Sequence, residues 1–273
     1  MDNLETENIE LELLLKAIYM KYGYDFRSYS RASVKRRVKQ HLKKTGLKTI
    51  SDIQCKILYD KDFFSILLQD MSVNVTEMFR DPSFYRALRE KIIPELAKLP
   101  LIKIWHAGCS TGEEVYSMAI LLKEEGIYDK SRIYATDFDE EVLSKAKDGV
   151  YSIEKLRDYT INYKNAGGLE SFVDYYSAKY EFVLLDNSLK ENILFSNHNL
   201  VSDSVFGEMN MIVCRNVLIY FNRDLQDHVF SLFSNSLCQN GFLCLGSKET
   251  LRFSRNYEKF EDMVIKEKIY RKK

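Results

Sequence analysis

The chain has 273 residues, of which 45% are hydrophobic and 29% are charged, and its 40 basic and 40 acidic side chains cancel. This length and composition are typical of a soluble globular protein with an α/β core and one smaller domain. Zero net charge and the lack of an apolar run near ~18 residues argue against a nucleic-acid partner and against direct membrane insertion. Five cysteines without a Cys-x-x-Cys pair, four scattered histidines and no visible secretory signal predict a reduced, cytoplasmic protein without a metal site.

An all-helical domain is predicted for residues 1–71, where no strand-like alternation occurs. The first helix shows apolar side chains at helical spacing: Leu11, Leu14, Leu15, Ile18 and Tyr22. Further helices are predicted at 33–44, ending at Gly46, and at 50–59, followed by a short apolar turn at 63–71.

The stretch from Lys21 to Lys48 contains ten basic side chains and a single acid, Asp25. Such asymmetry in a neutral protein suggests an acidic partner for the basic helix 33–44. The alternative is a solvated helix face without a binding role.

A linker segment and a helix are predicted for residues 72–100. Asp81 and Pro82 resemble an N-cap and a first helical residue, and the helix from Ser83 to about Ile93 is expected to be interrupted or kinked at Pro94.

Residues 101–273 alternate between strand and helix patterns, which predicts a parallel α/β sheet. The expected strands are 102–107, 132–136, 209–214, 242–245 and 263–270, and the expected helices are 113–124, 140–147 and 223–238, the last ending at Asn240-Gly241. A small antiparallel insertion at about 155–196, with strand-like pieces at 180–185 and 193–196, interrupts this rhythm.

The segment from Trp105 to Met118 joins a strand to a helix through glycines. A loop of this kind brings backbone N–H groups close to a ligand at Gly108. Two acids, Glu113 and Glu114, open the helix, which favours a cationic or neutral ligand such as S-adenosylmethionine over a pyrophosphate. A favourable interaction with the helix macrodipole is the alternative explanation for the acids. A dinucleotide site is the competing functional interpretation, but the glycines do not form the G-x-G-x-x-G pattern of such a site, and no lysine follows them as in a P-loop.

Polar residues follow the other strands. Asp137 ends the second strand, where nucleotide-binding folds place an acid on the ribose hydroxyls, although Asp137 or Asp139 could simply cap the next helix. Arg215 and Asn216 follow the most apolar strand and either bind ligand or stabilise the loop. The remaining candidates are Asn74, Thr76 and Arg80 in the linker, Asn199-Leu200 in a later loop, and Tyr220. For the three linker residues, the alternative is that they only cap the helix at Asp81.

Several motifs, in this order and spacing, make the chain similar to the CheR-type chemoreceptor glutamate methyltransferases. They are NVTEMFRD (74–81), AGCSTGEEVYSMA (107–119), ATDFD (135–139), NL (199–200), CRNVLIYF (214–221) and GFLCLGSKE (241–249). The resemblance implies a helical N-terminal domain and a class I, Rossmann-like S-adenosylmethionine-dependent methyltransferase domain with a small β-subdomain. It also implies cofactor contacts at Asn74, Thr76, Arg80, Glu113, Asp137, Asn199, Leu200, Arg215 and Asn216.

By the same resemblance, Arg80 and Tyr220 flank the methyl-transfer site, and Lys35, Arg36 and Lys39 of the basic helix face an acidic helical region of a methyl-accepting receptor or another signalling protein. The products would be glutamate methyl esters and S-adenosylhomocysteine. The segment 166–176 shows no clear signature for holding a receptor C-terminal peptide, which favours direct substrate binding. Two alternatives are a class I methyltransferase with a different substrate and a non-catalytic S-adenosylmethionine-binding module.

Overall fold

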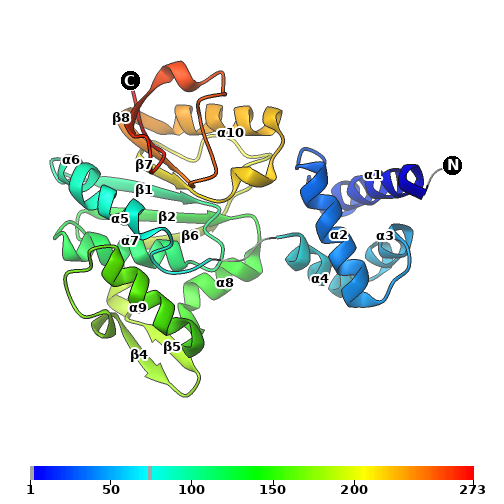
Figure 1. The fold of residues 1–273 in the computed structure, drawn as a ribbon, viewed down its shortest axis with the longest axis horizontal. Helices are drawn as coiled ribbons and strands as arrows, with labels where there is room; N and C mark the ends of the chain where they lie inside the picture. The colour runs from blue at the N-terminus through cyan, green and yellow to red at the C-terminus, as the bar shows by residue number, and fades with distance from the viewer. Residues whose placement is uncertain (1–2, 73–75) are drawn as a thin grey trace. The chain divides into compact units, whose positions relative to one another are not determined.

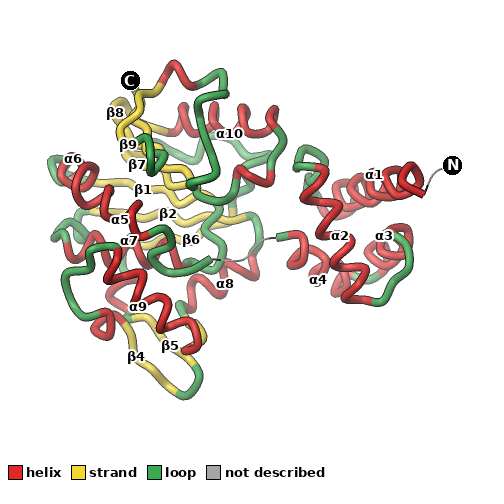
Figure 2. The backbone as a smooth tube through the Cα atoms, viewed as in Figure 1, coloured by secondary structure: helices red, strands yellow, loops and turns green. Residues whose placement is uncertain are grey.

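The computed structural model describes residues 3–72 and 76–273, and the chain forms two compact units. The first comprises Met1–Asn74 with Tyr220–Gln226, and the second comprises Val75–Ile219 with Asp227–Lys273. Figure 1 follows the chain by residue number, and Figure 2 separates its helices from its strands. Within the described residues, none of the helices is both long enough and apolar enough to cross a membrane.

The first unit is built from helices, as predicted. They are α1 (Asn3–Tyr22), α2 (Arg31–Thr45), α3 (Ile50–Tyr59) and α4 (Lys61–Met71). α2 ends at Gly46, whose φ of 70° is the left-handed conformation that glycine adopts without cost. A capping box begins α3, since the Thr49 side chain accepts from the Asp52 N–H and the Asp52 side chain accepts from the Thr49 N–H.

A short segment from a distant part of the sequence completes this unit. The Ser30 N–H donates to the Tyr220 carbonyl (2.8 Å), and the Asn222 N–H donates to the Ser28 carbonyl (3.0 Å). Tyr29 and Phe221 also pack edge to face, with ring centroids 4.9 Å apart. These contacts explain why 220–226 groups with the helices rather than with the strand before it.

A seven-stranded sheet with the order β6-β2-β1-β7-β8-β10-β9 forms the centre of the second unit. Its strands are β1 (Ile102–Ala107), β2 (Ser131–Asp137), β6 (Ile193–Asn197), β7 (Met209–Cys214), β8 (Leu237–Leu245), β9 (Phe260–Val264) and β10 (Ile269–Lys272). The first five strands in this order are parallel, and β10 is antiparallel to both of its neighbours. The direction of strand addition reverses between β1 and β7, which is where open α/β sheets bind ligands.

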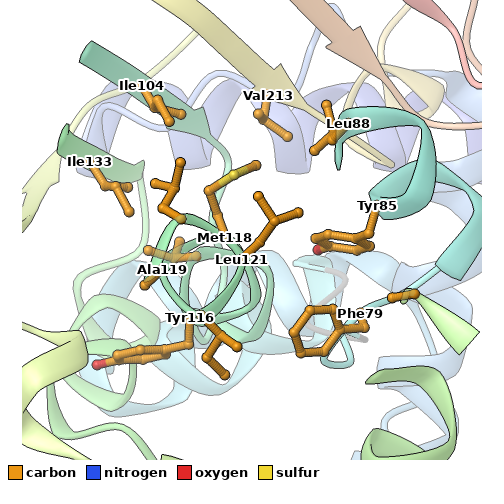
Figure 3. Packing of buried hydrophobic residues seen from close by; sticks show 14 of the residues in the cluster. Phe79, Tyr85, Leu88, Ile104, Tyr116, Met118, Ala119, Leu121, Ile133 and Val213 are labelled. Carbon is orange, nitrogen blue, oxygen red and sulfur yellow. The ribbon is translucent and has the colours of Figure 1, made fainter. Parts of the chain in front are cut away.

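Helices cover both faces of this sheet. They are α5 (Pro82–Ala87), the π-helical turn η1 (Leu88–Ile92), α6 (Ile93–Leu96), α7 (Glu113–Glu124), α8 (Glu140–Asp148) and α10 (Arg223–Ser236). Successive side chains of a strand point to opposite faces, so Ile104 packs into the cluster that contains Met118 of α7, while Trp105 contacts Phe233 of α10 (5.6 Å between ring centroids). Figure 3 shows Ile104, Ile133 and Val213 of three adjacent strands facing α7.

A three-stranded antiparallel sheet forms the small subdomain, in the order β3-β5-β4. Its elements are β3 (Val150–Ser152), α9 (Leu156–Asn165), β4 (Tyr176–Lys179) and β5 (Phe182–Leu185), with short 3₁₀ turns at Ile153–Lys155, Phe172–Tyr175 and Asn187–Leu189. Glu124 of α7 ties this subdomain to the main sheet, since its carboxylate accepts from the Tyr175 hydroxyl (3.0 Å) and the Leu169 N–H (3.1 Å).

Three assignments around the strands differ from the predictions. The piece at 193–196 belongs to β6, which pairs with β2 in the main sheet and not with the insertion. Asn240-Gly241 lies inside β8 and does not end a helix, because the chain turns from α10 directly into the strand at Leu237. The C-terminal strand is a hairpin of β9 and β10. The helix after Asp81 is interrupted before Pro94, as expected: α5 passes into the π-helical turn η1, and α6 begins with Pro94 in its first turn, where a missing N–H costs little.

Candidate active site

The carboxyl ends of β1, β2 and β7 lie side by side at one edge of the sheet. Ala107 pairs with Thr136, and His106 pairs with Val213, in parallel register. Gly108 and Arg215 follow β1 and β7, and Asp137 is the last residue of β2, so the three residues stand at the start of neighbouring loops. The structure brings together the three strand ends that the sequence singled out.

The loop after β1 requires glycine at its first position. Gly108 has a φ of +78°, and a Cβ on it would lie 2.6 Å from Cγ2 of Val217, in the loop after β7. The N–H groups of Gly108 and Cys109 both donate to the Thr136 carbonyl (2.8 and 2.9 Å), which fixes this loop against the end of β2. The Val217 side chain thus packs against the Gly108 backbone, at the place where the direction of strand addition reverses.

Asp137 holds the glycine loop from the end of β2. One carboxylate oxygen accepts from the Ser110 N–H (2.9 Å), and the other accepts from the Asp139 N–H (3.2 Å). Burial raises the pKa of Asp137 to about 6. Asp139 is the residue that caps α8, since its side chain accepts from the N–H groups of Glu141 and Val142. The two aspartates have separate roles, and only Asp137 faces the loop.

The two acids at the start of α7 have different surroundings. Glu113 is 1% exposed, accepts from the Thr111 hydroxyl (2.6 Å) and lies 3.9 Å from Nζ of Lys155. Burial raises its pKa. Burial acts in the same direction on Glu114, but contacts with His106 (3.2 Å) and Arg215 (2.9 Å) outweigh it and leave the pKa of Glu114 lowered.

The described part of the linker before α5 adopts an unusual backbone. Phe79 and Asp81, on either side of Arg80, have φ values of 53° and 54°, which residues with a side chain rarely adopt. Thr76 and Arg80 are half-buried, and Asn74 lies outside the described residues.

Asp81 is the N-cap residue of α5 and Pro82 its first residue, as predicted, but the Asp81 side chain does not cap the helix. Its carboxylate makes no cap bond to α5 and instead accepts from Arg215 at 2.7 Å. A charged partner gives a stronger hydrogen bond than a backbone N–H, so the long-range ion pair outcompetes the local cap.

Arg215 is buried, with 2% of its side chain exposed. Its guanidinium contacts Asp81 (2.7 Å) and Glu114 (2.9 Å) and lies over the Phe84 ring (4.1 Å to the centroid). These contacts hold the loop after β7 against α5 and α7, while a contact of Arg215 with the cofactor stays a prediction.

Asn216 and the residues after it are held by Glu249. Asn216 has a φ of 62°, and its N–H donates to Glu249 (3.1 Å). The same carboxylate accepts from the N–H groups of Gly246 (2.6 Å), Leu218 (2.7 Å) and Ile219 (3.3 Å). Gly246 is required here because a Cβ would lie 2.8 Å from the Asn216 nitrogen.

The loop after β6 lies next to Asp137, since the His198 N–H donates to the Asp137 carbonyl (3.1 Å). The Asn199 side chain accepts from the Val201 N–H (3.0 Å) and closes a local turn, and Leu200 is 7% exposed. No group of three or more His, Cys, Asp and Glu side chains suited to a metal ion occurs within residues 3–72 and 76–273.

The other predicted site residues lie in the first unit. Tyr220 packs under Arg37, whose guanidinium carbon is 4.4 Å from the ring centroid. On α2, Lys35 and Lys39 both pair with Glu7 of α1, at 2.9 and 2.6 Å, while Arg36 is exposed. None of the ion pairs found among the described residues includes Arg36.

Sequence reasoning missed two residues that shape this edge of the sheet. Glu249 stands three residues after Gly246 and closes the motif 241–249, but no role was predicted for it from the sequence. Ser117 lies on α7, where its hydroxyl accepts from the Phe79 N–H (2.9 Å) and donates to the Glu113 carbonyl (2.7 Å). No local pattern marks such a serine.

The strand order, the antiparallel β10 and the glycine loop at the switch point define a class I S-adenosylmethionine-dependent methyltransferase. Comparison with known proteins gives the family. Residues 74–269 match the S-adenosylmethionine-binding domain of CheR methyltransferases, and residues 9–72 match the all-alpha domain of the same family. The chain belongs to the CheR methyltransferase family, and its cofactor is S-adenosylmethionine.

Curated relatives include a putative methyltransferase Cher3 of Pseudomonas putida, which is 49% identical over all of both chains. A chemotaxis protein methyltransferase of Borreliella burgdorferi is 28% identical over 94% of this chain and 93% of its own length. Chemotaxis protein methyltransferase 1 of Vibrio cholerae is 31% identical over 80% of each chain.

Proposed function

We propose that this enzyme transfers methyl groups to glutamate carboxylates in an acidic helical region of a methyl-accepting receptor or another signalling protein. The basic face of α2, present in a member of the CheR methyltransferase family, is the observation that carries this proposal. The names of the relatives from Borreliella burgdorferi and Vibrio cholerae support a substrate in chemotaxis.

The carboxyl edge of the sheet fits the cofactor. Asp137 and Glu113 are acids beside the glycine loop, and a cationic sulfonium suits such surroundings better than a phosphate does. S-adenosylmethionine held there would supply an electrophilic methyl group for a carboxylate oxygen, and S-adenosylhomocysteine would be the leaving group. Gly108, Asp137 and Asn216 lie in the loops that would hold S-adenosylmethionine. Thr76, Arg80, Asn199 and Leu200 are further residues that would contact it.

The target carboxylate needs no general base. A glutamate side chain has an ordinary pKa of about 4.3, so it is already the nucleophilic anion at neutral pH. The protein therefore contributes mainly orientation, which supplies roughly 7–11 kcal/mol in well-aligned reactions. We assign this role to Arg80, because a guanidinium binds a carboxylate in a fixed, bidentate geometry. Tyr220 is the second predicted catalytic residue.

The basic face of α2 recognises the target by charge. Arg36 is exposed, and the Lys35 and Lys39 ammonium groups share one carboxylate, that of Glu7. These lysines lower the pKa of Glu7 through hydrogen bonds from Lys39 and then Lys35. When an acidic helix docks on this face, its carboxylates would replace Glu7 as the partners of Lys35 and Lys39.

The decisive experiment uses radiolabelled methyl donor and a membrane fraction that contains methyl-accepting receptors. Glutamate esters release labelled methanol in mild base, whereas methylated amines do not. We expect base-labile label on a receptor-sized protein, and its loss when the receptor glutamates are replaced by alanine. Base-stable label would assign the enzyme to another nucleophile, and no transfer despite cofactor binding would assign it to a binding role.

A further inference from the structure

We propose that Arg215 is a positioning residue for Arg80. Its guanidinium ties the end of β7 to the Phe79–Asp81 segment and thereby fixes the backbone from which the Arg80 side chain projects. This inference rests on the proposed function for the role of Arg80, but the contacts that support it are independent of the substrate.

The Phe79–Asp81 segment needs external support. Left-handed φ values at two residues with side chains are held only where the surroundings determine them. On one side, the Phe79 N–H donates to the Ser117 hydroxyl (2.9 Å), and the Phe79 ring is completely buried beside Tyr85 and Tyr163. These contacts anchor the first residue of the segment to α7.

Arg215 anchors the other two residues. One terminal nitrogen contacts the Asp81 carboxylate (2.7 Å), and the other lies 3.4 Å from the Arg80 carbonyl and 2.9 Å from Glu114. Only Nε lacks a hydrogen-bond partner among the described residues, and that atom is buried. Both terminal nitrogens of Arg215 therefore donate to protein groups, and two of the three acceptors belong to the segment that carries Arg80.

The supporting network continues behind Arg215. Glu114 contacts Arg215 with one carboxylate oxygen and Nδ1 of His106 with the other (3.2 Å). Since His106 lies on β1 and Arg215 follows β7, the chain of contacts links two adjacent strands to the segment. Replacing Arg215 by alanine would leave the Glu114 carboxylate without the Arg215 guanidinium and would lower the stability of the folded protein. Lysine is the informative replacement, because it keeps the charge but cannot reach Asp81 and Glu114 in two directions.

The second unit contains a matched control. Arg89 has only 9% of its side chain exposed and also bridges two acids, Glu124 and Glu125, at the opposite end of α7. Arg89→Lys and Arg215→Lys remove the same chemistry from comparable surroundings, but only Arg215 contacts the segment around Arg80. Any general effect of losing a buried guanidinium appears in both variants.

The test combines hydrogen exchange with kinetics in the full chain. We expect Arg215→Lys to speed amide exchange of residues 76–81, to lower kcat by about 100-fold, and to leave the Kd for S-adenosylhomocysteine within about threefold. Arg89→Lys should lower Tm similarly but leave exchange of 76–81 and kcat near wild type. Asp81→Asn should reduce kcat, and the double variant with Arg215→Lys should be no slower than the worse single variant.

Different failures have different meanings. Unchanged exchange of 76–81 in Arg215→Lys, or a weakened Kd with normal kcat, would overturn the inference and return Arg215 to a cofactor contact. If wild type forms no glutamate ester but the exchange difference is present, the proposed function fails while the positioning of Arg80 by Arg215 stands.

Discussion

Replacing Glu249 by glutamine tests how the loop after β7 is held. Each carboxylate oxygen accepts two backbone N–H groups, one oxygen from Gly246 and Asn216 and the other from Leu218 and Ile219. Glutamine keeps one oxygen and turns an NH₂ group toward the other pair of donors. Two hydrogen bonds are therefore lost, and two buried N–H groups face another donor.

The magnitude follows from these four contacts. Hydrogen bonds to a charged acceptor contribute about 1.5–3 kcal/mol each, so losing two lowers the free energy of unfolding by about 3 kcal/mol or more. For a domain of this size, that corresponds to a Tm lower by about 6–12 °C. We also expect about tenfold weaker binding of S-adenosylhomocysteine, because Asn216 loses its backbone support.

Thermal unfolding by circular dichroism and titration calorimetry measure the two effects. The experiments are run at pH 8, because burial raises the pKa of Glu249 above its ordinary value of 4.5. Glu258→Gln is the control, since Glu258 is exposed and its loss should change stability by less than about 0.5 kcal/mol. A Tm for Glu249→Gln within about 2 °C of that control would refute the idea that these hydrogen bonds hold the loop.

Three further predictions concern the charged residues. Arg80→Ala should lower turnover by about 100-fold, whereas Arg86→Ala, an exposed change on α5, should not; equal rates would remove Arg80 from the mechanism. Arg36→Glu should raise KM for the receptor without changing cofactor affinity, and the same charge reversal at exposed Lys16 is its control; an unchanged KM would contradict a binding role for α2. Asp137 binds its proton more tightly in the folded state, with a pKa of about 6 against an ordinary 3.8. Relative to Asp137→Asn, wild type should therefore lose about 3 kcal/mol of stability as pH rises from below 3.8 to about 6; a constant difference by denaturant unfolding would show that the pKa is ordinary.

The sequence predicted elements whose ends carry strong local signals. β1 (Ile102–Ala107) and α7 (Glu113–Glu124) have the predicted bounds, because an apolar run ends at one glycine and a helical pattern begins after the next. α3 (Ile50–Tyr59) also has the predicted bounds, and the capping box of Thr49 and Asp52 fixes where it begins. These features depend on residues within a few positions of each other.

Features set by distant contacts were not predictable in this way. Asp81 has the sequence neighbours of a helix cap, but its partner Arg215 is 134 positions away. The strand at 193–197 is too short for its own pattern to show whether it pairs with β2 or with the insertion. Tyr220 follows a strand of the second unit, yet its backbone pairs with Ser30 of the first.

The end of β7 is the point where the long-range polar contacts of the site meet. Arg215 reaches back to the Arg80 segment and to α7, while the next residue, Asn216, is held from β8 by Glu249. The loop after β2 is simpler, since Asp137 uses both carboxylate oxygens on N–H groups of its own and the neighbouring loop. A parallel sheet leaves the backbone groups of these loops without ladder partners, and buried polar groups must be paired. Buried side chains that pair them therefore determine where the ligand-facing residues lie, although they need not touch the ligand themselves.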